Sequence, residues 1–321
     1  RNCFYDGKLL PIYKLDGLCI SIGNLTVGGT GKTPLTIEVA NYLKNQGHRP
    51  VILSRGYKSG LSKGRVALYQ SGELVATDDP KGFKGIYADE ARMQSAILKS
   101  VPVLISDNRY RASCWFIGRH PSYAPTHWIL DDGFQHRKIH RDCDVLLISS
   151  HNALAKEKVI PQGFLREQLT SMKRAQVIIH TRPEGKSYEN NKNLCRNLVG
   201  KDVRVLSSSF QVEVPVQVDD PSQKLSFEMG PAVVVCAIAN PQQFFQNIEN
   251  LKIPIAHKIN FLDHSPINLK KVLPYCRPHQ PIITTEKDYW RDPSVFRDLK
   301  NPVFISKISV SLDMSFLNDH L

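Results

Sequence analysis

The sequence reads Gly23-Asn24-Leu25-Thr26-Val27-Gly28-Gly29-Thr30-Gly31-Lys32-Thr33-Pro34 between an apolar run, residues 18–22, and a helix-like segment, residues 35–43. A strand, a glycine-rich turn and a helix that opens with Gly-Lys-Thr form the layout of a phosphate-binding P-loop. The glycines let successive backbone N–H groups approach phosphate oxygens, and the helix N-terminus adds a partial positive charge. These residues therefore predict a site for the phosphates of a nucleotide.

The residues of this loop have expected roles in such a site. Lys32 would place a positive charge on the β- and γ-phosphates, and the Thr33 hydroxyl would ligate Mg²⁺. Thr26 departs from the usual pattern, which has glycine at that position, while Pro34 fits a first helical turn, where a missing N–H costs little. The alternative is a glycine-rich turn with a surface lysine, and the strand–loop–helix context weighs against it. The predicted ATP contacts are Thr26, Val27, Gly28, Gly29, Thr30, Gly31, Lys32 and Thr33.

The composition is typical of a globular protein with an anionic partner. The 321 residues suffice for one large or two ordinary domains, and the 41% hydrophobic content supplies a core. No apolar run approaches the roughly 20 residues needed to span a bilayer. The net charge of +12 favours phosphates, acidic lipid headgroups or nucleic acid, but no aromatic-interleaved basic stripe of a single-strand binder occurs. The seven cysteines form no Cys-x-x-Cys pair, so we expect reduced, buried, cytosolic thiols rather than disulfides or a zinc site.

Apolar strand-like runs alternate with helical patterns along the first two thirds of the chain. We expect strands at residues 18–22, 51–53, 101–105, 128–130, 145–149 and 177–180, a hairpin at residues 65–69 and 74–77, and helices at residues 35–44, 89–99 and 110–119. This alternation predicts an α/β fold, a P-loop NTPase-like parallel sheet with helices on both faces. The pattern changes after about residue 206. We therefore expect a P-loop core domain over residues 1–206, and a linker with a smaller C-terminal α/β domain over residues 207–321.

Acidic residues stand where two of these strands end. In open parallel sheets ligands gather at the carboxyl ends of the strands. Asp131 and Asp132 follow the strand at residues 128–130, so one of them is placed to hold or orient Mg²⁺, although an Asp-Asp-Gly turn is also common structure. Asp107 and Asn108 follow the strand at residues 101–105. An acid there could accept a proton from an acceptor hydroxyl, and the composition supports equally the alternative that these two residues, both good caps, cap the next helix.

Three further polar pairs could contribute to such a site. Gln135 and His136 lie in a donor-rich run behind the two aspartates, which suits a phosphate or sugar. Arg166 and Glu167 could add a cation and a metal-binding carboxylate, although alone such a pair is more often a surface ion pair. His264 stands beside an aspartate that could tune its pKa, and an exposed loop pair is the default reading.

Together these motifs resemble the tetraacyldisaccharide 4′-kinase family, the lipid A pathway kinases of Gram-negative bacteria. The matching pieces occur in family order over nearly the whole chain, at residues 23–34, 54–57, 89–90, 109, 130–136, 140–142, 161–167, 263–264 and 284–288. The P-loop alone is a generic signal. The strings at residues 23–34 and 131–136 together are specific to this family.

The resemblance implies transfer of the γ-phosphate of ATP to the 4′-hydroxyl of a tetraacyldisaccharide 1-phosphate, which gives lipid IVA. It also implies a P-loop kinase core, a smaller C-terminal domain on a two-stranded linker, and ATP with Mg²⁺ as cofactors. Family members carry a hydrophobic N-terminal helix before the position of Arg1, and because this sequence starts without it we expect a truncated sequence. The expected location is the cytoplasmic face of the inner membrane. The expected partners are the acylated disaccharide lipid and an anionic membrane surface, with no nucleic acid and no obligate protein partner.

The family also suggests roles for individual residues. It often has aspartate at the position of Asn108, which cannot act as a base, so our hypothesis is that the neighbouring Asp107 accepts the proton with help from His264. The expected catalytic residues are Asp107, Asn108, Lys32, His264, Asp131 and Asp132. The expected substrate contacts are Tyr57, Arg109, Gln135, His136 and Arg166. The expected metal ligands are Thr33, Asp132 and Glu167.

Other functions remain as alternatives. The main one is a partner-regulated P-loop ATPase; many of these have a lysine at the position of Val27, which counts against it. A nucleotide-binding module without catalysis is suggested by Asn108. A dinucleotide oxidoreductase is disfavoured because no Gly-x-Gly-x-x-Gly follows a strand.

Overall fold

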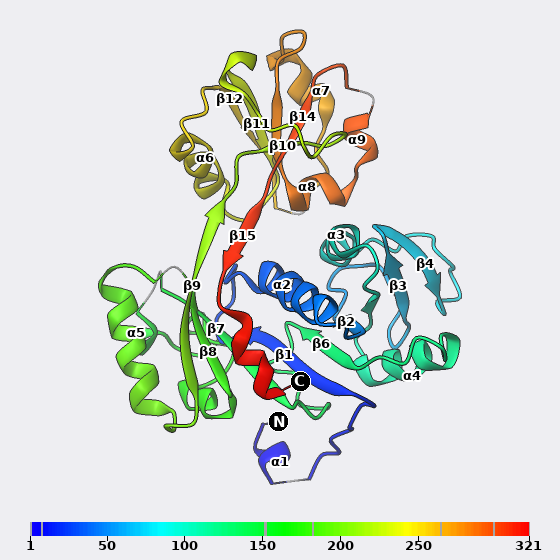
Figure 1. Cartoon of the computed structure of the whole chain (residues 1–321), viewed down its shortest axis with the longest axis vertical. Coiled ribbons are helices and arrows are strands. Elements are labelled where there is room, and N and C mark those ends of the chain that lie inside the picture. The colour runs from blue at the N-terminus through cyan, green and yellow to red at the C-terminus, as the bar shows by residue number, and fades with distance from the viewer. Residues whose placement is uncertain are drawn as a thin grey trace. The chain divides into compact units, whose positions relative to one another are not determined.

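The computed structural model describes residues 2–7, 9–150, 153–181, 183–263, 265–297 and 299–320. The chain divides into two compact units, a larger one of Arg1–Phe210 with Val310–Leu321 and a smaller one of Gln211–Ser309, both traced in Figure 1. Sequence analysis put the domain boundary after residue 206 and the chain's end in the second domain. The larger unit instead extends to Phe210 and takes in the last residues.

The larger unit alternates strands with helices, as its apolar runs predict. Two strands, β9 and β15, include residues on both sides of the division into units. In chain order the elements are α1 (Asn2–Asp6), β1 (Leu18–Asn24), α2 (Lys32–Asn45), β2 (Pro50–Ser54), β3 (Ala67–Gln70), β4 (Glu73–Thr77), α3 (Asp89–Leu98), β5 (Val103–Ile105), α4 (Arg109–Arg119), β6 (His127–Asp131), β7 (Cys143–Ser149), η1 (Leu154–Lys156), η2 (Leu169–Arg174), β8 (Val177–Thr181), α5 (Gly185–Leu198), β9 (Arg204–Val212), β15 (Ile308–Ser311) and η5 (Met314–His320).

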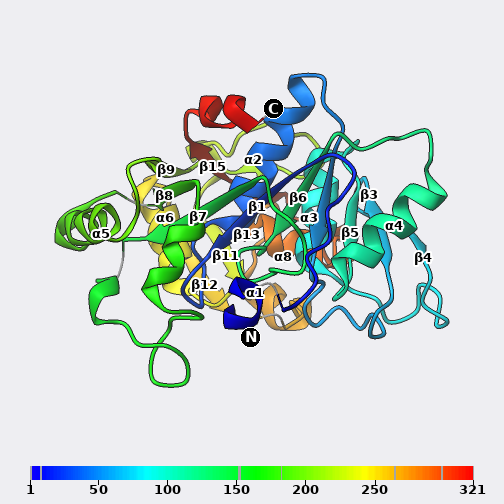
Figure 2. The ribbon, with the colours of Figure 1, turned by 90° about the horizontal axis from the view of Figure 1, so that it is seen from below.

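Strand β1 lies inside a ten-stranded sheet of order β15-β9-β8-β7-β1-β6-β2-β5-β3-β4, and Figure 2 shows β1 between β7 and β6. Pairing is parallel from β9 through to β5, and only the hairpin of β3 and β4 adds antiparallel pairs among the described strand pairs. The expected parallel α/β sheet is therefore confirmed. Because parallel strands end at one edge, the loops after β1, β6, β2 and β5 share that edge.

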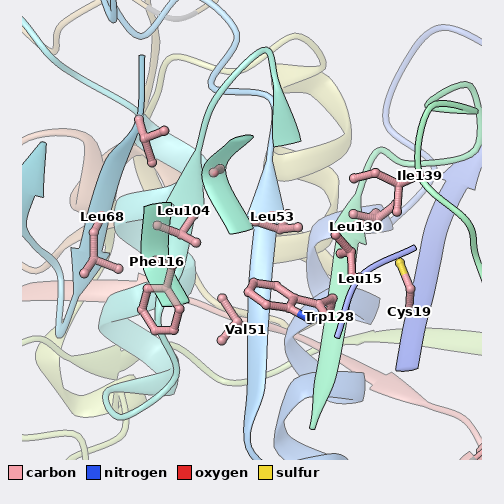
Figure 3. Close-up of a cluster of buried hydrophobic side chains, with 12 residues drawn as sticks. Leu15, Cys19, Val51, Leu53, Leu68, Leu104, Phe116, Trp128, Leu130 and Ile139 are labelled. Atoms are coloured by element: carbon pink, nitrogen blue, oxygen red, sulfur yellow. The ribbon is translucent and has the colours of Figure 1, made fainter. Parts of the chain in front are cut away.

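Helices cover both faces of this sheet. Helix α4 inserts Phe116 into a cluster with Trp128, Leu53 and Leu130 from the strands (Figure 3). All four side chains are at most 1% exposed. Alternate residues of the same strands point to the opposite face. There α2 and α3 pack against each other and against the sheet (Figure 1). The buried faces fix β1 and α2, and so fix the loop between them.

The smaller unit has its own five-stranded sheet, of order β10-β14-β13-β11-β12. Asp288 is buried there and accepts hydrogen bonds from the Ala237 amide at 3.0 Å and the Thr285 hydroxyl at 2.7 Å, a structural role at a helix start. The elements are β10 (Val216–Gln217), η3 (Phe227–Met229), β11 (Ala232–Cys236), α6 (Pro241–Asn250), β12 (Ile255–Asn260), α7 (Leu269–Val272), η4 (Leu273–Tyr275), β13 (Ile282–Thr285), α8 (Glu286–Arg291), α9 (Ser294–Arg297) and β14 (Val303–Ser306).

Among the helices in the described part of the chain, none combines the length and the apolar character that crossing a membrane requires.

Candidate phosphoryl-transfer site

The loop between β1 and α2 presents its backbone to solvent. Gly31 is the N-cap residue of α2, with φ 86° and ψ 20°, and as a glycine it has no side chain that could cap the first turn. The early N–H groups of the helix are therefore left for another acceptor. A Cβ atom added at Gly28 or Gly29 would meet nothing within 4 Å, so open space lies over the loop. This is the geometry that a phosphate group requires.

A second segment pairs with the start of the loop. Thr26 forms an antiparallel bridge with Leu165, and the Val27 amide donates to the Phe164 carbonyl at 2.9 Å. The backbones at Thr26 and Val27, both expected to contact ATP, are thus engaged with this segment. The Arg166 amide donates to the Leu25 carbonyl at 2.7 Å. This pairing brings Arg166 to the P-loop from a distant part of the sequence.

Asp131 is buried between three elements. Its two carboxylate oxygens accept hydrogen bonds from Thr36 Oγ1 of α2 at 3.2 Å and from Gln94 Nε2 of α3 at 2.9 Å. Burial, with a smaller effect of the Glu90 charge, raises the pKa of Asp131 to about 6. Asp131 therefore ties β6 to the P-loop helix, and its carboxylate is fully engaged within the protein.

Asp132 points the other way, towards the P-loop. It adopts φ 50°, a left-handed conformation, and the buried Arg109 guanidinium donates to the carbonyl groups of Asp131 and Asp132. Burial alone would raise the pKa of Asp132, but Lys32 and Arg166 outweigh it and the pKa is lowered. Burial lowers the pKa of Arg109 itself. The turn thus separates a buried aspartate from an ionised one that faces the loop.

Five residues, which we call the P-loop ring, close a cycle of contacts above β1. Lys32 Nζ lies 3.3 Å from Asn24 Oδ1 and 3.6 Å from Asp132 Oδ1. Arg166 Nη1 donates to both carboxylate oxygens of Asp132 at 2.8 Å, and lies 3.4 Å from Gln135 Oε1. Gln135 Nε2 closes the ring by donating to the Asn24 carbonyl at 2.9 Å. The structure thus brings Lys32, Asp132, Gln135 and Arg166 together, as expected, and adds Asn24.

The three expected metal ligands differ in their surroundings. Glu167 is 7% exposed, and Arg174 Nη2 contacts its two carboxylate oxygens at 3.0 and 2.9 Å. The Thr33 hydroxyl makes no hydrogen bond to the described residues. The described residues contain no group of three or more His, Cys, Asp or Glu side chains arranged for a metal ion.

The residues expected on the acceptor side are more dispersed. The Asn108 side chain caps α4 by accepting from the Arg111 amide at 3.2 Å, and the exposed Asp107 accepts from the Gly64 amide at 2.8 Å. The sheet order places them three strands from β1, whereas Asp132 is one strand away. Tyr57 is 73% exposed in the loop after β2. His264 lies outside the described residues.

His136 was expected at the site from the sequence, whereas Asn24 was not. His136 lies in the turn behind the two aspartates, where its amide donates to the Gly133 carbonyl at 2.7 Å. Asn24 was not predicted from the sequence to belong to the P-loop ring. The one signal for it was a polar residue at the end of an otherwise apolar strand. Gln94 and Thr36 were missed too, because each looks like an ordinary polar residue of a helix.

The chain is similar to known proteins of one family. The family model described as LpxK: Tetraacyldisaccharide-1-P 4′-kinase matches residues 1–321. The chain is similar to a tetraacyldisaccharide 4′-kinase from Pelodictyon phaeoclathratiforme, with 30% identity over 97% of this chain and 89% of the relative. It is also similar to a protein of the same name from Aquifex aeolicus, with 33% identity over 82% and 77%. A crystal structure of LpxK from Aquifex aeolicus in complex with ATP matches with a TM-score of 0.76 and 27% identity, covering 100% of this chain and 92% of that one.

Proposed function

This chain belongs to the tetraacyldisaccharide-1-P 4′-kinase family, and we propose that it transfers the γ-phosphate of ATP to the 4′-hydroxyl of a tetraacylated glucosamine disaccharide 1-phosphate, giving lipid IVA. The observation that carries the proposal is the P-loop ring. It places two cations, Lys32 and Arg166, around one carboxylate beside an open glycine-rich loop. Phosphoryl transfer depends chiefly on such positioned charge.

The ring suggests how ATP enters the site. Before the nucleotide binds, Asp132 contacts Arg166 Nη1 at 2.8 Å and lies 3.6 Å from Lys32 Nζ. The triphosphate carries more negative charge than one carboxylate, so it competes for Lys32 and Arg166. Backbone N–H groups from Gly28 to Thr33 then hold the phosphates, with Lys32 on the β- and γ-phosphates. Arg166, fixed by its backbone bond to the P-loop, neutralises charge that develops on the transferred group.

Thr33 and Asp132 fit a magnesium ion. Mg²⁺ takes one or two carboxylates from a protein and completes its shell with phosphates and water. The Asp132 side chain is 35% exposed and its pKa is lowered, so an ionised oxygen is available. When bound, the ion would screen the charge of the β- and γ-phosphates. Glu167 is the further candidate, for which it would have to release Arg174.

Magnesium titrations separate the candidate ligands. We expect Asp132→Asn to need more Mg²⁺ for half-maximal rate than the unchanged protein, and Glu167→Gln to do so only if Glu167 releases Arg174. A variant with an unchanged Mg²⁺ requirement removes that residue from the set of ligands.

We propose that the residue that accepts the proton of the 4′-hydroxyl is one of the acids at the carboxyl edge of the sheet. Asp107 is the candidate that the sequence offers. The first turn of α3 offers Asp89 and Glu90, and the hydrogen bond from Gln94 Nε2 to Asp131 at 2.9 Å joins this helix to β6. Removing a general base typically lowers the rate about 10²- to 10⁴-fold. Near-normal turnover of Asp107→Ala, with a large loss in Asp89→Ala or Glu90→Ala, would move the role to α3.

An anionic lipid surface is the proposed partner beyond the substrate, at the cytoplasmic face of the inner membrane. Support comes from two loops joined by the Tyr87 amide, which donates to the Ser59 carbonyl at 2.7 Å. Exposed aromatic rings stand out from these loops among exposed lysines, as at a lipid–water interface. We call this set the two-loop surface: Tyr57 (73% exposed), Lys58, Phe83 (56%), Lys84 and Tyr87 (70%).

Vesicle sedimentation tests this surface. We expect phosphatidylglycerol vesicles to retain the protein, and Phe83→Ser with Tyr87→Ser to weaken retention. The control is Phe227→Ser, which alters a 64% exposed aromatic residue of the smaller unit. Equal retention of all three proteins, or equal retention by uncharged phosphatidylcholine, would count against the proposal.

Labelled ATP tests the reaction itself. Incubation with [γ-³²P]ATP and the tetraacyldisaccharide 1-phosphate, followed by thin-layer chromatography, should yield one labelled lipid that carries phosphate at the 4′ position. ATP turnover that rises with a protein partner and labels no lipid would favour the partner-regulated ATPase instead.

A further inference from the structure

We propose that Asn24 is a positioning residue for phosphoryl transfer, whose amide oxygen holds the Lys32 ammonium group over the P-loop and keeps it from settling on Asp132. The inference rests on the proposed function, in which Lys32 binds the phosphates of ATP. Asn24 itself is not proposed to contact a reacting atom. It acts through Lys32.

The main chain of Asn24 is fixed on both sides. As the last residue of β1, it lies opposite Leu147 of β7 in the sheet register. Its carbonyl accepts from Gln135 Nε2 at 2.9 Å. Asn24 is 0% exposed, so its side chain has no water to turn towards. The amide group is therefore held in place before ATP arrives.

The side chain serves Lys32 and no other described residue. Oδ1 accepts from Lys32 Nζ at 3.3 Å, whereas Nδ2 is buried and has no hydrogen-bond partner among the described residues. A buried asparagine with a purely structural role usually serves the backbone, as Asn191 does when its Oδ1 accepts from the Leu154 amide at 2.9 Å. The one bond that Asn24 makes through its side chain points to Lys32.

The choice of a neutral acceptor has an electrostatic consequence. Lys32 Nζ has two acceptors at similar distances, Asn24 Oδ1 at 3.3 Å and Asp132 Oδ1 at 3.6 Å. A carboxylate at position 24 would neutralise the ammonium group and repel phosphate. An amide oxygen orients the group and leaves its charge for the nucleotide. Without that oxygen, Asp132 becomes the sole partner and Lys32 is drawn away from the loop.

Three variants test this inference through ATP affinity, measured by calorimetry without lipid. Asn24→Leu keeps the branched shape but loses the acceptor, and we expect the Kd for ATP to rise about 10-fold, the size of one hydrogen bond to a charged group. Asn24→Asp keeps the shape and the acceptor, and we expect a larger rise than for Asn24→Leu. A structural role predicts the reverse order. The matched control, Asn191→Leu, should lower the unfolding temperature and leave the Kd unchanged.

A double-mutant cycle makes the test specific to Lys32. In a Lys32→Ala background, Asn24→Leu should change the Kd less than about 2-fold, because the group it positions is gone. An undiminished effect in that background, or equal effects of Asn24→Leu and Asn191→Leu, overturns the inference. ATP binding with no lipid phosphorylation would defeat the proposed function and still decide the role of Asn24. A wild-type protein that binds no ATP would defeat both.

Discussion

At the level of single residues, Arg166 is the cation whose loss should slow the chemical step most selectively. It contacts Asp132 at 2.8 Å, and its backbone is bonded to the P-loop, so its guanidinium is placed before ATP binds. We expect Arg166→Ala to lower kcat about 10³-fold, as removal of an arginine that stabilises a transferring phosphoryl group does. Single-turnover phosphorylation with saturating ATP measures this loss.

Arg166→Lys is the matched variant for that experiment. It keeps the charge but loses the planar guanidinium group, whose Nη1 contacts both carboxylate oxygens. A partial rescue of kcat is expected. If Arg166→Ala raises only the KM for ATP, with kcat unchanged, Arg166 binds the ground state and the transition state equally and does not speed the chemical step.

His180 of β8 should make the free energy of unfolding depend on pH. It is 0% exposed in β8, and burial, with a smaller effect of Lys192, lowers its pKa to about 4. In the unfolded chain the pKa is near 6.5, so between about pH 6.5 and 4 the unfolded state binds more protons. Stability is therefore complete above pH 6.5 and falls as the pH drops, by up to about 3 kcal/mol from this residue.

Urea unfolding at several pH values tests this sign. We expect His180→Leu to flatten the loss between pH 6.5 and 4, leaving a residual slope from His127, whose pKa is also lowered to about 4. Both ring nitrogens of His180 lack a partner among the described residues, so the leucine should cost little at pH 7.5. An identical slope in His180→Leu would refute the assignment.

At the level of elements, Gly31 is the residue that the junction of loop and helix α2 requires. Its φ of 86° is left-handed, and an added Cβ would lie 2.2 Å from the Phe210 ring of β9. We expect Gly31→Ala to lower the free energy of unfolding by about 1–3 kcal/mol. Urea unfolding followed by tryptophan emission measures it.

Gly29→Ala is the control from the same loop. Its Cβ would meet nothing within 4 Å, and its φ lies outside the left-handed range, so the change should stay near 0.5 kcal/mol. In a Phe210→Ala background, Gly31→Ala should still lower the free energy of unfolding through backbone strain. The additional loss caused by the contact with the Phe210 ring should disappear. If Gly31→Ala and Gly29→Ala lower the free energy of unfolding equally, neither the left-handed backbone at Gly31 nor the nearby Phe210 ring contributes to stability.

Local patterns predicted elements well where apolar spacing was regular. The helix expected at residues 35–44 is α2, Lys32–Asn45, and the hairpin at residues 65–69 and 74–77 is β3 with β4. Helix α5 was not predicted, because its polar sequence buries little beyond Asn191 and Cys195. Periodicity cannot reveal a helix whose apolar stripe is that narrow.

The site was predictable only in its parts. Spacing marked Lys32 and the two aspartates, since a glycine-rich turn and strand ends carry local signatures. It could not show that residues 164–166 return to pair with the P-loop, which depends on pairing between distant segments. Nor could it tell Asp131, bonded to Gln94, from Asp132, bonded to Arg166, because both occupy one turn. Asn108 was weighed equally as a cap and as part of the catalytic set, and in the structure it is a cap.

For the whole molecule, the two compact units should unfold as separate cooperative units. Clusters of buried side chains lie within one unit each, such as Trp128 with Phe116 in the larger and Phe244 with Phe304 in the smaller. Calorimetry should then give a van't Hoff enthalpy smaller than the calorimetric one. Because unfolding enthalpy scales with residue number, the larger unit supplies the larger transition.

ATP should move these two transitions differently. The P-loop lies in the larger unit, so ATP at about 100 times its Kd should stabilise that unit by about 2.7 kcal/mol and raise its midpoint by several degrees. The Lys32→Ala variant should lose most of this shift while keeping both transitions. A single transition with equal enthalpies would show that the units unfold together. A shift confined to the smaller transition would place the main nucleotide contacts outside the unit that carries the P-loop.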